Sequence, residues 1–495
     1  MSTAVIIRPT SSVRTLDFDL VRKFCLYLAI VAFVIAPFTS DPLATAGGAI
    51  VPWLLIRIIG TPTMPAAIAY LFLWQWMQVY ARLPVSWLDH ESLSSSLYGP
   101  EVARAFWYML ASLIVMALSF RLMLWNLRPP TRAQLTAHYR WQPNDIMTVY
   151  GLALAVSIGS TIATRAVPSL AQVIDGLSHL KVVALMVVFI YAMSTGRGQT
   201  FALAAVLFEI LIGFTGFLSD FRGVFIYLAI AALAARVRMK GTTIIGGLAG
   251  AATLIALALF WTSVKMDYRE FAAQSDESQT IKVPLSERLE FLGQRALSSG
   301  NMDLSLTFHT LLSRLAYTDI FASVINVQDA SPEPIPMRQW TEAIEHVLQP
   351  RILFPDKPAL SDTEVYMRLA KAFSPENMRA GTSISVGYMA ENYADLGFPG
   401  MLVGIAALGI LLAGVIRGLM HANLPQAIRE GIIMGFAFSM ARDGVEVSLP
   451  KVLGSMLMFF IIYIVLNKFA FPRVVQWLDQ RAAAPRLRHS RLKPS

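Results

Sequence analysis

Runs of about 20 apolar residues recur along this chain, and they constrain its fold more than any other feature. A helix of about 20 apolar residues is long enough to cross the hydrocarbon core of a bilayer. We predict twelve such spans, within a range of eleven to thirteen, because four of them are short or interrupted. They lie near residues 24–40, 45–60, 64–81, 103–125, 146–165, 180–195, 200–218, 223–236, 242–263, 398–417, 430–446 and 450–468.

Composition supports the same fold class. Of the 495 residues, 55% are apolar and 15% are charged, whereas soluble domains carry about 25% charged residues. This balance excludes a soluble enzyme and a disordered chain, and the single cysteine, Cys25, excludes a disulfide-stapled scaffold. We therefore predict an all-α, polytopic membrane helix bundle. No small-residue cleavage site follows the first apolar run, so no cleavable signal is expected.

The distribution of basic residues predicts the orientation of the bundle. With the N-terminus in the cytoplasm, the predicted cytoplasmic segments hold 21 Lys/Arg and the short external segments hold seven. Basic residues favour the cytoplasmic side of a membrane, so both termini are predicted to be cytoplasmic. The net charge of +9 follows this pattern and therefore indicates no nucleic-acid partner.

One long hydrophilic segment, residues 264–385, separates the ninth and tenth predicted spans. It carries 12 Lys/Arg and 16 Asp/Glu. Apolar residues recur at helical spacing in 288–297, 306–327 and 340–348, with proline-rich turns between them. We predict a large helical loop that caps the outer mouth of the bundle.

This segment divides the chain into three predicted parts. They are an N-terminal membrane bundle of about nine spans (1–263), the outer loop or cap (264–385), and a C-terminal bundle of about three spans with a basic tail (386–495). No internal repeat is visible, which disfavours an inverted-repeat transporter.

Several cations are predicted on the outer side, where cations are sparse. Each of them alone is compatible with an interfacial or solvated charge that has no specific role. Together they indicate a site for a lipid diphosphate, because guanidinium groups match phosphate oxygens bidentately and stay charged. Tyr317 joins them because it would share a helical face with Arg314, three residues away. The candidate binding residues are Arg222, Arg314, Arg351, Arg442, Lys357 and Tyr317.

Glu391 is the candidate proton acceptor. It stands at the outer boundary of a span in an apolar stretch of small residues, one turn after Tyr388. Partial desolvation would suit its carboxylate to accept a proton. The alternative is a helix-start carboxylate favoured by the helix dipole. The sequence shows no His/Cys cluster with metal-ligand spacing, so neither a metal nor a cofactor is predicted.

Two groups of motifs are similar to a known family. The Arg222-Gly223 turn after a Gly-Phe run resembles the arginine turn of Wzy-type O-antigen and exopolysaccharide polymerases. The order Pro350-Arg351…Phe354-Pro-Asp-Lys-Pro358, then Thr382…Gly387…Glu391-Asn-Tyr393…Gly397-Phe-Pro-Gly400, is similar to that of the oligosaccharide repeat-unit polymerases. The architecture resembles theirs over the whole chain. One departure is Asp220-Phe221 before Arg222, where the family turn often reads Gly-Ser-Arg-Gly, so Asp220 could compete for Arg222.

The resemblance implies a membrane glycosyltransferase of the bacterial inner membrane that acts at its periplasmic face. It implies a polyprenyl-pyrophosphate-linked glycan as donor, a second one as acceptor, and a chain-length regulator and a flippase as partners. The arginines would hold the diphosphate, and Glu391, or His309 as second choice, would deprotonate the acceptor hydroxyl. Tyr388, Tyr393 and Trp340 are candidates to stack on sugars, although core packing is the commoner role of such rings.

Other classes remain open. An O-antigen ligase has similar spans and a periplasmic loop, but uses a histidine base and a lipid A acceptor. A transporter or flippase with twelve spans is a different class, against which stand the missing repeat and the scarcity of mid-span charges, Glu209 being the main exception. A non-catalytic scaffold of an export complex is the third alternative.

Overall fold

The computed structural model describes most of the chain. The described residues are 14–96, 98–167, 171–216, 220–274, 281–298, 303–349, 354, 357, 361–371, 384–441 and 444–483. They contain helices, turns and one isolated bridge between Thr15 and Arg238, and no other strand pairing occurs among them. The all-α prediction is confirmed.

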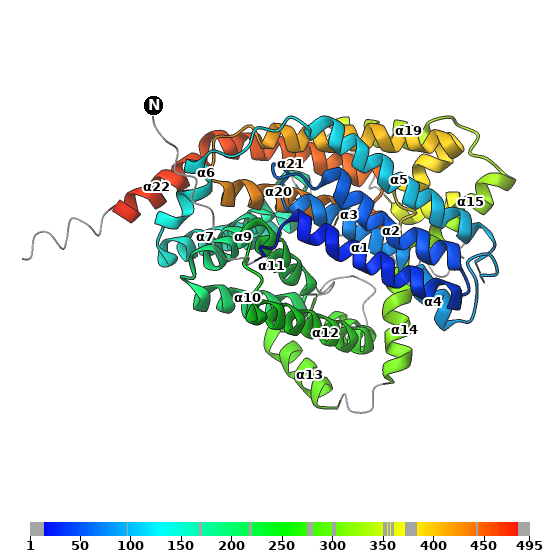
Figure 1. The fold of residues 1–495 in the computed structure, drawn as a ribbon, viewed down its shortest axis with the longest axis horizontal. Coiled ribbons are helices and arrows are strands. Elements are labelled where there is room, and N and C mark those ends of the chain that lie inside the picture. Colours follow the sequence, from blue (N-terminus) through cyan, green and yellow to red (C-terminus); the bar gives the residue numbers. More distant parts are fainter. Residues whose placement is uncertain are drawn as a thin grey trace, which may run out of the picture.

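The N-terminal half forms most of a bundle of long helices (Figure 1). Its helices are α1 (Phe18–Ile35), α2 (Pro42–Ile59), α3 (Ala67–Tyr80), α4 (Arg82–Leu88), α5 (Glu101–Leu124), α6 (Arg132–Thr136), α7 (Pro143–Ala166), α8 (Ala171–Ser178), α9 (Leu180–Thr195), α10 (Gln199–Thr215), α11 (Arg222–Ala234) and α12 (Gly241–Ala273). Two short 3-10 turns lie between these helices: η1 (Ala36–Phe38) between α1 and α2, and η2 (Ala137–Arg140) between α6 and α7.

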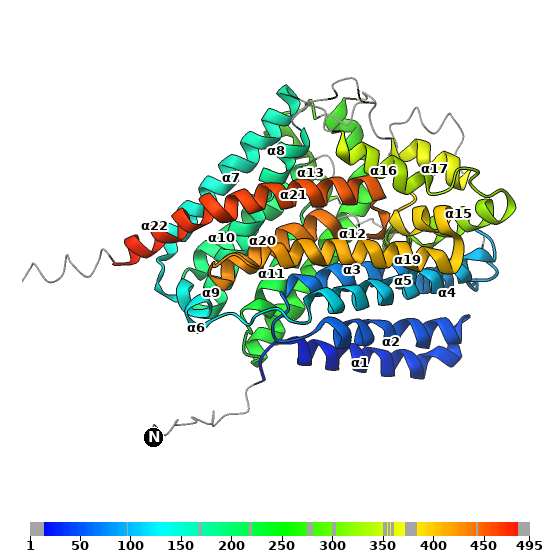
Figure 2. The same cartoon turned by 90° about the horizontal axis from the view of Figure 1, so that it is seen from above.

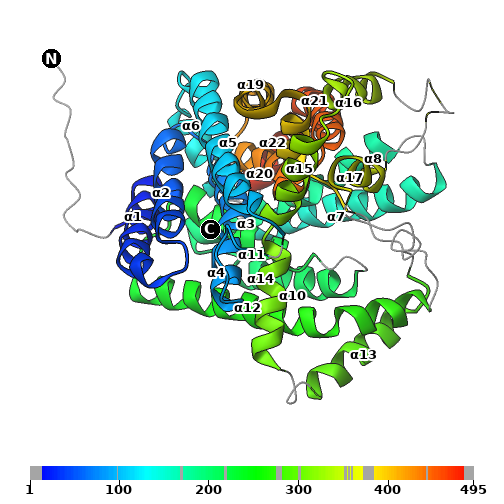
Figure 3. The same cartoon turned by 90° about the vertical axis from the view of Figure 1, so that its right-hand side faces the viewer.

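The remaining helices lie in the segment that we predicted as a cap, α13 to α17, and in the C-terminal part of the chain. They are α13 (Leu285–Leu297), α14 (Leu304–Leu315), α15 (Thr318–Ala330), α16 (Arg338–Leu348), α17 (Asp362–Ala370), α19 (Tyr388–Leu419), α20 (Gln426–Ala441), the 3-10 turn η5 (Gly444–Glu446), α21 (Leu449–Phe469) and α22 (Phe471–Ala483). Helices α15 and α17 lie at one end of the molecule and α22 at the other (Figures 1 and 2). Helices α12, α13 and α14 lie along one face (Figure 3).

Eight described segments are long and apolar enough to cross a membrane. They are α1 with η1, α2, α5, α7, the end of α8 with α9, α12, α19, and α21 with α22. Helices α10 and α11 are apolar but shorter, and α3 and α20 have 14 and 16 residues. Each predicted span falls on a helix, but the count of about twelve spans stays a prediction.

The exposed side chains of these helices fit a lipid environment. On α1, Phe24 is 67% exposed and Phe33 is 70% exposed. None of the most apolar 18-residue window of α12 is buried within the molecule. Large apolar patches that face outward are rare on soluble monomers and common where lipid or a partner covers them.

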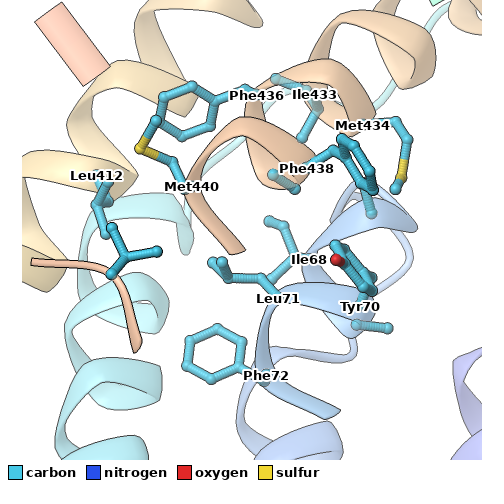
Figure 4. Close-up of a cluster of buried hydrophobic side chains, with 14 of the residues drawn as sticks. Ile68, Tyr70, Leu71, Phe72, Leu412, Ile433, Met434, Phe436, Phe438 and Met440 are labelled. Atoms are coloured by element: carbon cyan, nitrogen blue, oxygen red, sulfur yellow. The ribbon is translucent and has the colours of Figure 1, made fainter. Parts of the chain in front are cut away.

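The interior of the bundle is a continuous apolar core. Figure 4 shows Tyr70 of α3 beside Phe438 of α20, and the two rings are stacked with their centroids 6.3 Å apart. Both residues are at most 6% exposed. This packing fixes the C-terminal end of α3, which carries the polar residues described below.

Two features differ from the prediction for residues 264–385. Helix α12 continues to Ala273, ten residues beyond the predicted boundary, because Val264, Tyr268 and Ala272 continue its buried face. The predicted helix 306–327 is two helices, α14 and α15, which are separated at Ala316–Tyr317. The prediction that Arg314 and Tyr317 share one helical face is therefore wrong. Over the whole chain, five short helices were not predicted: α4, α6, α8, α17 and α22.

Candidate functional site

The end of α3 contacts two other segments through one residue, Gln78, which is 2% exposed. Its backbone carbonyl accepts the N–H of Tyr317 (3.3 Å). Its amide oxygen accepts the N–H of Val445 (2.9 Å), and its amide nitrogen donates to Oε1 of Glu446 (3.3 Å). Gly444, with φ of +68°, leaves the space that this amide fills. Gln78 thus fixes the positions of Tyr317 and Glu446 together.

Four cations from three other helices interact around Lys265, which also interacts with Glu446. Lys265 of α12 is repelled by the charges of Arg269, Arg314 and Arg222, and is attracted by Glu446. Arg269 is repelled by Arg314 as well. Like charges raise the energy of such a cluster, and a bound anion lowers it. We call Arg222, Lys265, Arg269 and Arg314 the cationic cluster.

Local structure explains how these cations meet. Arg222 is the first residue of α11 and lies over the ring of Trp74 on α3, 5.2 Å from its centroid. Lys265 and Arg269 lie one turn apart on the extension of α12. Arg314 lies in the last turn of α14. Arg314 is exposed and the other three cations are half-buried, so the cluster is open to a ligand.

Tyr317 lies beside the cluster but is already engaged. Its hydroxyl donates to the carbonyl of Ser385. Burial, together with the charge of Glu446, raises the pKa of Tyr317 well above its ordinary value. It is therefore a neutral hydrogen-bonding group next to Glu446.

Glu391 has a different environment from the one predicted. It is 2% exposed, and its Oε2 accepts the backbone N–H of Leu449 (2.5 Å) at the start of α21. Its charged neighbours include Asp362, Asp395 and Arg368. Tyr388, one turn earlier, is 3% exposed, and its hydroxyl donates to Gln75. Both side chains join helices within the core.

Three other predicted residues are held by protein contacts away from the cationic cluster. The amino group of Lys357 donates to the carbonyls of His346 and Gln349, at the end of α16. The hydroxyl of Tyr393 donates to Asp329 (2.7 Å). Trp340 is 9% exposed and donates to Asn392 (3.0 Å).

His309 lies on α14, the helix that ends with Arg314. Its Nε2 lies 2.7 Å from Oδ1 of Asp89, which follows α4. Arg351 and Arg442 lie outside the described residues.

Sequence reasoning missed Lys265, Arg269 and Gln78. The signal for the first two was present: two cations spaced four residues apart directly after an apolar run, which predicts one helical face. They were assigned to the loop because the helix was expected to end at residue 263. Gln78 lies inside an apolar run and gives no such signal.

A metal site has no support in the part of the chain that the structure describes. No group of three His, Cys, Asp or Glu side chains there could hold an ion.

Fold and site together define an all-α protein with membrane-length helices and a cationic cluster at the ends of α11, α12 and α14. Residues 112–421 match the family described as Domain of unknown function (DUF8712). The match covers more than half of the chain, so the chain belongs to this family. No curated protein and no solved structure shows significant similarity to it.

Proposed function

We propose that the protein is a membrane glycosyltransferase that polymerises polyprenyl-diphosphate-linked oligosaccharide repeat units. The observation that carries the proposal is the cationic cluster. Guanidinium and ammonium groups neutralise a diphosphate as it leaves the anomeric carbon, and such electrostatic stabilisation is often the largest catalytic contribution. The eight membrane-length helices supply a surface for the prenyl tail.

The topology belongs to the same proposal. Helices α15 and α17 lie opposite α22 (Figure 2), as expected if the cap is periplasmic and the basic C-terminal tail is cytoplasmic. The site would then act at the periplasmic face of a bacterial inner membrane with about twelve spans, both termini lying in the cytoplasm. A chain-length regulator and a flippase would be its partners.

The role of the cluster can be tested in cells that lack the native gene. Arg222→Ala, Lys265→Ala and Arg314→Ala should each shorten the surface glycan toward single repeats at normal membrane levels of the protein. Arg295→Ala is the matched control, because Arg295 forms an exposed pair with Asp267 (2.7 Å) on the same face. Full-length polymer in all three cluster variants would refute the proposal.

A binding experiment separates anion recognition from turnover. Trp74 lies under Arg222, so titration of the purified protein with inorganic pyrophosphate should change tryptophan fluorescence, and Trp74→Phe should remove most of that change. Loss of one charged contact of about 1.5–3 kcal/mol should weaken binding about 10–100-fold in Arg222→Ala. Unchanged affinity in both Arg222→Ala and Arg314→Ala would exclude a diphosphate site here.

An O-antigen ligase is the second candidate, and His309 is the observation that favours it. Its contact with Asp89 resembles the carboxylate that orients a histidine base. Product analysis separates the two functions: loss of a ligase leaves long undelivered polymer, whereas loss of a polymerase leaves single repeats.

A further inference from the structure

The 3-10 turn η5, Gly444–Glu446, carries a carboxylate that Gln78 holds in position and that attracts Lys265 of the cationic cluster. Gln78 holds the turn at two points, through Val445 N–H (2.9 Å) and through Oε1 of Glu446 (3.3 Å). Glu446 itself is half-buried, so its carboxylate is reachable from outside the core. A catalytic carboxylate needs this combination of fixed direction and access.

Glu446 also interacts with two different parts of the site, the cationic cluster and the segment that carries Tyr317. It attracts Lys265 on the side of the cationic cluster, and it interacts with Tyr317 on the side of the cap. A group in this position lies close to any diphosphate bound by the cluster. The sugar attached to that diphosphate, and the hydroxyl that attacks it, would lie beside the same carboxylate.

Two carboxylates of neighbouring segments, Glu391 and Asp362, hold helices together. Glu391 is buried against the N–H of Leu449. Asp362 accepts the hydroxyl of Ser448 (3.0 Å) and pairs with Lys451. These two groups hold α17, α19 and α21 together.

We propose that Glu446, and not Glu391, accepts the proton of the acceptor hydroxyl, and that Gln78 is its positioning residue. This inference rests on the proposed function. In the step, the acceptor oxygen bonds to the anomeric carbon of the donor while the bond from that carbon to the diphosphate oxygen breaks. The bonding electron pair leaves with the diphosphate, toward the cationic cluster. The hydroxyl proton passes to the carboxylate of Glu446 and from there to water.

The experiment uses the full-length protein in proteoliposomes, with lipid-linked repeat units extracted from cells that lack the polymerase. Glu446→Gln should lower kcat by about 100-fold or more, the range of a lost general base. Its affinity for inorganic pyrophosphate should be no weaker than that of the wild type. Glu446→Asp should restore part of the rate, because it keeps a carboxylate on the same turn.

Gln78→Glu tests the positioning role without emptying the site. The new side chain still accepts the N–H of Val445 but cannot donate to Glu446 while ionised. A fall in kcat with little change in KM and with unchanged thermal stability supports the positioning role. A lower melting temperature that accompanies the fall in kcat would mean that Gln78 has a structural role only.

The outcomes separate the two proposals. If the wild type makes no polymer from these substrates, the proposed function fails and this inference fails with it. If the wild type makes polymer and Glu446→Gln stays within about threefold of its kcat, the proton-acceptor role is overturned and the polymerase proposal stands. If Glu446→Gln does not fold, Glu446→Asp and Gln78→Glu decide the same question.

Discussion

Replacement of Arg82 by alanine should destabilise the protein strongly, because Arg82 is the most deeply buried cation in the ion pairs of the described residues. Arg82 lies on α4 and is 1% exposed. Its guanidinium donates to Asp319 (2.7 Å), Ser86 (3.0 Å) and Ser96 (2.7 Å). The side chain therefore joins the bundle to the first turn of α15, and hence to the segment that carries Tyr317.

The expected magnitude follows from burial. The side chain of Asp319 is 18% exposed, so Arg82→Ala leaves a largely desolvated carboxylate without its cation. Removal of one partner of a buried pair costs about 3–5 kcal/mol. Since 1 kcal/mol shifts the melting temperature of a unit of 150–250 residues by about 2–4 °C, the midpoint should fall by about 6 °C or more.

Arg104→Ala is the matched control. Arg104 on α5 pairs with Asp329 on α15 at 2.5 Å, and both side chains are 43% exposed. Exposed pairs contribute about 0–1 kcal/mol, so this variant should melt within about 3 °C of the wild type. The melting temperatures of both variants can be measured in detergent by size-exclusion chromatography of samples heated to increasing temperatures. Equal shifts in the two variants would refute the argument from burial.

Three further predictions concern stability and use the same assay. Glu391→Ala should cost about 2–3 kcal/mol, because it leaves the buried N–H of Leu449 without its acceptor; a change below about 0.5 kcal/mol would mean that this contact is not formed. Gly387→Ala should cost about 3 kcal/mol or more, because Gly387 has φ of +82° and a Cβ there would lie 2.1 Å from the carbonyl oxygen of Val445. Burial raises the pKa of Asp319, so the folded state binds this proton more tightly than the unfolded chain does. The contribution of Asp319 to stability is therefore fully present below its pKa in the unfolded chain, and it is lost as pH rises through its pKa in the folded protein. Asp319→Asn should flatten the decline of the melting temperature with rising pH relative to the wild type.

The helical character of the fold could be predicted because apolar periodicity is a local property. Each predicted span falls on a helix, and the periodic segments of 264–385 fall on α13 to α16. The break between α14 and α15 could not be predicted in the same way. At this break the backbone N–H of Tyr317 donates a hydrogen bond to the carbonyl of Gln78, which is far away in the sequence, and no local pattern predicts such a contact.

Two of the predicted binding residues lie at helix ends in the cationic cluster, whereas the residues that sequence reasoning did not single out lie inside helices. Arg222 and Arg314 begin or end helices, where a charge stands out against an apolar run, and both interact with Lys265. Lys265 itself lies within α12, and Gln78 lies within α3. Their importance comes from which helices pack against them, and that is a tertiary property.

The motif that suggested Glu391 as a catalytic residue is explained by packing at the start of α19. Glu391 binds the first turn of α21, Asn392 accepts from Trp340, and Asp395 accepts the backbone N–H groups of Gln339 and Trp340 (both 3.0 Å) at the start of α16. One short helical segment thus joins the cap to the bundle through three polar side chains. Buried polar groups must be paired, so the same pattern of polar residues is expected in a segment that only joins helices and in one that is also catalytic. Under the proposed function, a proton acceptor is therefore better sought where a carboxylate is both fixed and reachable, as Glu446 is through Gln78 and beside Lys265.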